Sequence, residues 1–164
     1  MDYDEYKNFV RGVKKDYGKS LGIGWLVPSL RPVYDVASKQ ECIGWKLKWA
    51  GPFVADENYV CVREDWAGTP GAYIRRYFSY HYGPYHRLEG LEDAKWKAVV
   101  VRIDARSYNG RGFHIHDGRK DRRIHQDELS SPDLSQSGMV DFIERVTEVR
   151  KGQSVTDAFE LRFK

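Results

Sequence analysis

Residues 96–106 read WKAVVVRIDAR, and residues 112–116 read GFHIH. The end of the first stretch and all of the second alternate apolar with polar side chains, a period of two that predicts β-strands with one buried face. The polar side of the two strands comprises Arg102, Asp104, Arg106, His114 and His116. If the strands pair with their apolar sides together, these side chains share one polar face.

The same period continues through the middle of the chain. We predict further strands at residues 42–49, 59–66, 73–82 and 122–126, and residues 23–27 could add a short one. The links between them contain Gly-Pro, Asn-Gly and Asp-Gly pairs. Such short links favour antiparallel neighbours.

The two ends of the chain have the period of a helix. Residues 3–16 place Tyr6, Phe9, Val10 and Val13 on one stripe, after a capping-box-like start at Asp2 and Glu5. A second helix is predicted to begin near residues 131–133 and to end at residue 152, followed by a last strand over residues 155–163. The predicted fold is a single α+β domain, residues 1–164, in which an N-terminal and a C-terminal helix pack on an antiparallel sheet of about five to seven strands.

Composition excludes several classes of protein. The 164 residues contain no apolar run near the roughly 18 residues of a membrane span, and the acidic N-terminus is unlike a signal peptide. The expected location is therefore cytoplasmic, without a membrane partner. Two cysteines are too few for a disulfide scaffold. No phosphate loop or dinucleotide fingerprint is present, so we assign no cofactor.

Charge is concentrated in one segment. Residues 106–125 carry six basic and two acidic residues, net +4, against +3 for the whole chain, and hold three of the five histidines. An imidazole beside a carboxylate can transfer protons, and arginines can hold a phosphate. We therefore predict acid–base cleavage of a phosphodiester, with His114 or His116 as acid or base, Asp104 orienting one of them, and Arg102 and Arg106 on the phosphate.

Two alternatives use neighbouring features. His114 and His116 could instead hold a metal, completed by His125, Asp104 or Asp121, although we assign no metal ligand from this pattern. A non-catalytic module that binds protein or single-stranded nucleic acid is the other alternative, because aromatic and basic side chains suit stacking on bases and contact with phosphates. Its candidate residues are Tyr73, Arg75, Tyr77 and His81, which alternation places on one face of a strand with Ile74 on the opposite, core face, and Arg119, Lys120, Arg122 and Arg123 in a basic loop.

The order of these features resembles the TumE-type toxins of prokaryotic toxin–antitoxin pairs. The resemblance rests on a Tyr80-His81-Tyr82 strand, a strand that ends Arg102-Ile103-Asp104, the histidines His114, His116 and His125, and the amphipathic helix after them. It covers roughly residues 73–149. It implies an RNA-directed or defence-related role, such as a ribonuclease-like toxin, and an antitoxin-like protein partner.

Overall fold

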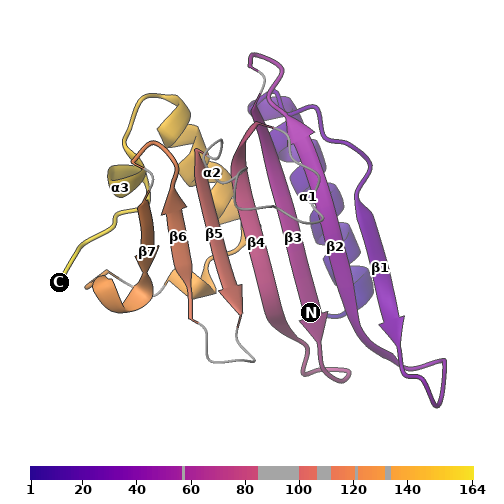
Figure 1. Ribbon diagram of the computed structural model, residues 1–164. Helices are drawn as coiled ribbons and strands as arrows, with labels where there is room; N and C mark the ends of the chain where they lie inside the picture. The colour runs from indigo at the N-terminus through magenta and orange to yellow at the C-terminus, as the bar shows by residue number, and fades with distance from the viewer. Residues whose placement is uncertain (57, 85–99, 107–111, 121, 132–133) are drawn as a thin grey trace.

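The computed structural model describes residues 1–56, 58–84, 100–106, 112–120, 122–131 and 134–164. Within these residues the chain forms one antiparallel sheet of seven strands that lie side by side in chain order (Figure 1). The strands are β1 Ser29–Tyr34, β2 Cys42–Pro52, β3 Asn58–Ala67, β4 Ile74–Pro84, β5 Val101–Arg106, β6 His114–Asp117 and β7 Arg122–His125. The predicted fold class is confirmed.

Two helices cover one face of the sheet. Helix α1, Tyr3–Ser20, packs Tyr6 against Trp45 of β2 and Trp66 of β3, and helix α2, Met139–Arg150, packs Phe142 against Tyr80 of β4. Figure 1 shows both helices behind the sheet. No helix in the described part of the chain is long and apolar enough to cross a membrane.

A row of buried side chains runs straight across the sheet on the helix side. Each member lies directly opposite the next on the neighbouring strand, and each is at most 2% exposed. The row consists of Trp49, Val62, Tyr80, Ile103, Ile115 and Ile124. Since side chains alternate between faces, this row fixes which residues of β5–β7 point to the other side.

The predicted N-terminal helix is confirmed with its cap. The backbone N–H of Glu5 donates to Oδ1 of Asp2 at 2.9 Å, and the backbone N–H of Asp2 donates to Oε2 of Glu5 at 2.7 Å. Tyr6, Val10 and Val13 are buried as expected. Phe9 remains 36% exposed, because it borders a cavity described below.

The start of the second helix was predicted too early. Helix α2 begins at Met139, after short 3₁₀ turns at Gln126–Glu128 and Leu134–Gln136. Instead of capping a helix, Ser131 binds the C-terminal segment, since its Oγ accepts a hydrogen bond from the backbone N–H of Arg162 at 2.5 Å and donates to the carbonyl of Glu160 at 3.0 Å. Ser131 therefore makes a tertiary contact with the C-terminal segment in place of the predicted helix cap.

Two strand predictions were also wrong. Residues 155–158 form the short helix α3, Val155–Ala158, capped by Oγ of Ser154, and Phe163 makes only an isolated bridge to Leu129. Residues 29–34, where no strand was predicted, form the edge strand β1. β1 contains Pro32, which a strand tolerates where one side has no neighbour.

Shortening the central isoleucine should test the buried row. We expect Ile115→Ala to lower the free energy of unfolding by about 2–5 kcal/mol, because Ile115 is fully buried and its loss leaves a cavity. Urea unfolding measures this, with Val36→Ala, at a side chain 86% exposed, as the control expected to change stability by less than about 0.5 kcal/mol. Similar midpoints for the two variants would contradict the assigned register.

Candidate functional site

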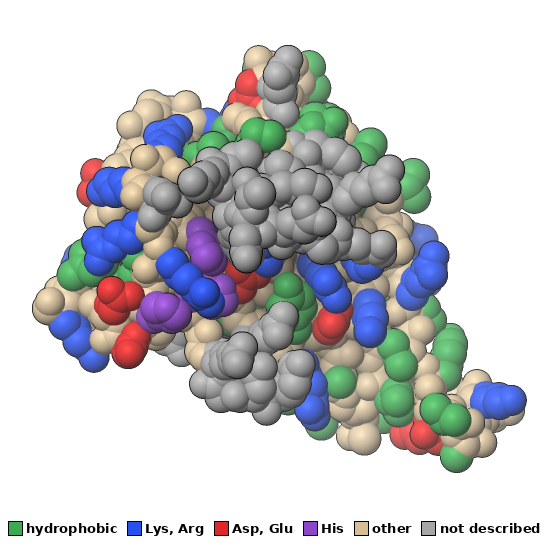
Figure 2. All heavy atoms as spheres, viewed as in Figure 1, with side chains coloured by type: hydrophobic (Ala, Val, Ile, Leu, Met, Phe, Trp, Pro, Cys, Tyr) green, Lys and Arg blue, Asp and Glu red, His purple; other side chains and the backbone are tan. Residues whose placement is uncertain are grey.

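The face of the sheet opposite the helices carries two polar rows. Strand register places the members of each row directly opposite one another on adjacent strands. One row is Arg63, Ser79, Asp104, His114 and His125; the other is Cys61, His81, Arg102, His116 and Arg123. Figure 2 shows the histidines gathered with Lys and Arg side chains over β5–β7 on this face. The expected common face for Arg102, Asp104, His114 and His116 is therefore present.

Asp104 is the buried centre of this face. It is 4% exposed, and its Oδ1 accepts hydrogen bonds from Nε and Nη2 of Arg102 at 3.0 and 2.9 Å. Its Oδ2 lies 3.3 Å from Nε2 of His114. The carboxylate therefore joins a guanidinium and an imidazole from adjacent strands, and it holds the orientation of both.

The environment of Asp104 favours its ionised form. Burial alone would raise its pKa, but hydrogen bonds from His114, Ser79 and Arg102, together with the charge of Arg102, outweigh burial and lower the pKa to about 2. Asp104 is thus a carboxylate throughout the physiological pH range.

The imidazoles of three histidines lie close together beside Asp104. The ring centroids of His114 and His116 are 5.1 Å apart at an interplanar angle of 80°, and those of His114 and His125 are 6.0 Å apart. Nη2 of Arg123 reaches within 3.5 Å of Nε2 of His114. Two cations, Arg102 and Arg123, therefore border the histidine pair.

His116 is held in its neutral form. Burial is the largest cause, and the charges of His114, Arg123 and Arg102 add to it, so that the pKa falls from 6.5 to about 4 even though Asp104 acts in the opposite direction. At neutral pH this imidazole has a lone pair on one ring nitrogen and can accept a proton or bind a metal.

Asp104, His114 and His116 also form a group that could hold a metal ion. One ligand atom from each lies within 4.8 Å of the others. Two imidazoles and one carboxylate suit Zn²⁺, Fe²⁺ or Ni²⁺. The adjacent guanidinium groups of Arg102 and Arg123 disfavour binding of a metal cation at this site by electrostatic repulsion, whereas they would attract an anion.

A bulge in β4 separates the predicted nucleic-acid residues. Tyr77 pairs with Asp65 but Arg75 pairs with Trp66, so Arg76 is an extra residue and the alternation shifts by one. As a result Arg75 lies on the helix side, hydrogen-bonded to the hydroxyl of Tyr80 at 2.6 Å. The expectation that Tyr73 and Arg75 share a face with Tyr77 and His81 was wrong.

Tyr73 likewise lies on the helix side of the sheet. Its hydroxyl donates to the carbonyl of Cys42 at 2.6 Å, and its ring centroid lies 4.9 Å from that of Trp45. Ile74, expected in the core, is 54% exposed. The position of Tyr73 and the exposure of Ile74 both follow from the bulge at Arg76.

The other two predicted residues of β4 lie on the polar face, together with an arginine from β3. The two predicted residues are Tyr77 and His81. The guanidinium of Arg63, which was not predicted as a site residue, lies 5.1 Å from the centroid of the Tyr77 ring. Only cross-strand pairing identifies Arg63, because it is far from the other site residues in sequence. The side chain of Arg106 lies outside the described part of the structure.

The four predicted cations of the basic loop also lie in different places. Arg119 and Lys120 are exposed in the β6–β7 turn, and Arg123 belongs to the polar face. Arg122 points to the other side, where Nη2 lies 3.7 Å from Oε1 of Glu128 and the guanidinium lies 4.6 Å from the centroid of the Phe163 ring. Three of the four cations therefore remain available to the polar face or its edge.

Comparisons with protein-family models, curated proteins and solved structures found no match to this chain. The site must therefore be interpreted from its own geometry.

The depressed pKa of His116 makes stability depend on pH in a definite direction. Between about pH 6.5 and 4 the unfolded chain protonates this imidazole while the folded chain does not, so the free energy of unfolding should fall as the pH is lowered through that window. We expect His116→Asn to show a smaller loss of stability between pH 7 and pH 5 than the wild type does. Urea unfolding at both pH values measures the difference.

A direct titration supplies the second measurement. The ring resonances of His116, followed by NMR, should shift with a midpoint near pH 4. A midpoint near 6.5, or identical pH dependence of stability in the two proteins, would show that His116 is not held neutral.

Proposed function

We propose that this protein cleaves single-stranded RNA by metal-independent acid–base catalysis on the polar face of the sheet. The observation that carries the proposal is the convergence of Asp104, His114 and His116, whose ligand atoms lie within 4.8 Å, between the cations Arg102 and Arg123. Two imidazoles supply a base and an acid, and an arginine stabilises the charge that develops on a phosphate. The resemblance to TumE-type toxins agrees with an RNA substrate.

The proposed reaction assigns one role to each imidazole. Neutral His116 takes the proton of the ribose 2′-hydroxyl, and the 2′-oxygen attacks the adjacent phosphorus. The bond from phosphorus to the 5′-oxygen breaks, and His114 gives its proton to that oxygen. The products are a 2′,3′-cyclic phosphate and a free 5′-hydroxyl, so protons and charges balance without a metal.

Asp104 and Arg102 act through the histidine rather than on the substrate. The Asp104 carboxylate contacts His114 Nε2 at 3.3 Å and is itself fixed by two hydrogen bonds from Arg102. It holds the His114 imidazole in position for the proton transfer. Arg123, which lies 3.5 Å from the same imidazole nitrogen, is the cation best placed for the phosphate.

Cleavage should depend on both histidines and on the 2′-hydroxyl. We expect His116→Ala and His114→Ala each to lower kcat by about 100-fold or more, the usual size of an acid–base contribution. The assay is cleavage of a panel of single-stranded RNAs covering every dinucleotide step, in the presence of EDTA. Arg31→Ala, at an exposed position on edge strand β1, is the control that should retain wild-type turnover.

Three results would contradict this proposal. They are no cleavage of any RNA by the wild type, equal cleavage by the histidine variants with unchanged melting temperatures, and cleavage of an RNA that lacks the 2′-hydroxyl at the scissile step. The product terminus is a separate check, because the proposed reaction leaves a cyclic phosphate.

A metal-dependent enzyme is the second candidate, favoured by the same three ligand atoms. Asp104, His114 and His116 would then hold the ion, and the activity would require it. Loss of cleavage in EDTA, restored by Zn²⁺, Mn²⁺ or Fe²⁺, would select this candidate over the metal-independent one. The electrostatics of Arg102 and Arg123 favour the anion-binding alternative.

Binding of RNA should depend on salt through the exposed cations. For single strands the logarithm of the binding constant falls with the logarithm of salt concentration by about 0.7 per phosphate contact. We expect Arg119→Ala to reduce the slope by about 0.7, while His116→Ala leaves it unchanged because that imidazole is neutral. Titration of an RNA carrying 2′-O-methyl groups, which block cleavage, measures the slope. An unchanged slope for Arg119→Ala would remove this turn from the binding surface.

A further inference from the structure

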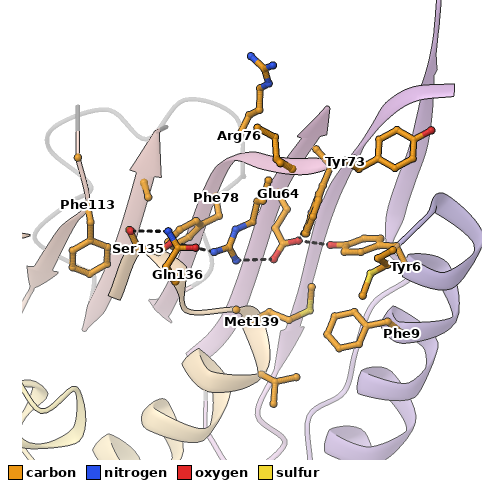
Figure 3. A pocket seen from close by; sticks show the side chains of 18 of the residues that line it. Tyr6, Phe9, Glu64, Tyr73, Arg76, Phe78, Phe113, Ser135, Gln136 and Met139 are labelled. Carbon is orange, nitrogen blue, oxygen red and sulfur yellow. Dashed lines mark hydrogen bonds and ion pairs between the residues drawn. The ribbon is translucent and has the colours of Figure 1, made fainter. Parts of the chain in front are cut away.

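A cavity of about 1000 Å³ lies on the other side of the sheet from the proposed catalytic site. It opens between the start of α2 and helix α1, above β3 and β4 (Figure 3). Its volume is at the upper end of the range for small-molecule sites. The cavity is also separate from the polar face. Ala105 and Phe113 line the cavity, whereas their chain neighbours Asp104 and His114 lie on the opposite face of the sheet.

The walls of this cavity are mainly apolar. The apolar side chains that line it include Trp66, Phe78, Phe113, Met139 and Val140. At its edge Phe9 is 36% and Ile74 is 54% exposed, and both are large apolar side chains that a bound molecule would cover. The body of a ligand for this cavity should therefore be apolar.

One buried carboxylate lies at the bottom of the cavity, and its hydrogen-bonding capacity is already used. Glu64 is 2% exposed; its Oε2 accepts from the hydroxyl of Tyr6 at 2.5 Å and from Nε1 of Trp66 at 2.8 Å, and its Oε1 accepts from the hydroxyl of Tyr80. Glu64 thus serves to hold the surrounding groups in place and offers little to a ligand.

The cations of the cavity come from the bulge in β4. Nη1 of Arg75 lies 3.7 Å from Oε1 of Glu64, Nη2 donates to the carbonyl of Ser135 at 3.1 Å, and the guanidinium lies 4.1 Å from the centroid of the Phe78 ring. Arg76, the extra residue of the bulge, also lines the cavity and stands at its rim, directed away from Glu64 (Figure 3). Arg75 is thus paired with Glu64, and Arg76 adds a second guanidinium at the rim. These three lining side chains carry a formal net charge of +1.

We propose that the cavity binds a small amphipathic anion, with an apolar body against Phe113, Met139 and Val140 and a single carboxylate near Arg75 and Arg76. Apolar walls with a few fixed polar groups are typical of small-molecule sites. An arginine that stacks on an aromatic ring and retains donor capacity is suited to a carboxylate. The bulge is what brings two successive arginines to one apolar cavity. This site does not depend on the proposed RNA cleavage.

Three molecules that share a ten-carbon chain and differ in charge test the proposal. They are decanoate, decanol and decylamine, each titrated into the protein below its aggregation concentration. Isothermal calorimetry measures affinity, and tryptophan fluorescence is a second readout, since Trp66, one of the five tryptophans, lines the cavity. We expect decanoate to bind at least about tenfold more tightly than decanol, in line with a charge-assisted hydrogen bond, and decylamine to bind more weakly than decanol.

Protein variants distinguish binding of the ligand's apolar body from binding of its carboxylate. Val140→Trp should fill the cavity and abolish binding of both decanoate and decanol; Ile74→Trp, at the exposed rim, serves the same purpose if the first variant does not fold. Arg76→Gln should weaken decanoate by up to about fivefold, the range for an exposed ion pair, and leave decanol unchanged. Arg31→Gln, on β1, is the matched control that should change neither.

Equal affinity for decanoate and decanol, or an effect of Arg76→Gln on both, would overturn the head-group assignment. Undiminished binding to folded Val140→Trp or Ile74→Trp would place the ligand elsewhere, and absence of binding by all three molecules would overturn the cavity proposal. RNA cleavage by the same preparations is a separate readout, so failure of one proposal does not decide the other.

Discussion

The burial of Ile103, Ile115 and Ile124 in one row fixes the arrangement of the polar face. These side chains lie opposite one another on β5, β6 and β7 and are at most 2% exposed beneath the helices. A slip of one residue in any of these strands would move apolar groups into water and charged groups under the helices, so the register is strongly determined. Given that register, Asp104 can only lie beside His114.

Glu64 and Asp104 are buried carboxylates on opposite faces of the sheet, and they have different partners. On the helix side, Glu64 is surrounded by neutral donors and one arginine, and its role is to join α1, β3 and β4. On the polar side, Asp104 is shared between Arg102 and His114, whose imidazole can exchange a proton. Both carboxylates have polar partners, but only Asp104 contacts an imidazole, and this makes the polar face the better candidate for chemistry.

Alternation was a reliable guide wherever it continued without interruption. It predicted the strands that became β2–β7. It also predicted the common face of Asp104, His114 and His116, because the paired residues of β5 and β6 keep the period of two. It failed at the bulge around Arg76, where one extra residue exchanges the faces. It also failed at residues 155–158, where the cap formed by Ser154 stabilises a helical turn in place of a strand.

The sequence by itself determined the fold class, the two amphipathic helices and the common face of Asp104, His114 and His116, since periodicity and capping are local properties of the chain. Only the tertiary structure decided that Arg63 joins that face, that Arg75 leaves it, and that Arg122 turns to Glu128. It also decided that His116 is neutral and that a cavity forms between the helices. These properties arise from burial, strand register and contacts between distant segments, which no short stretch of sequence contains.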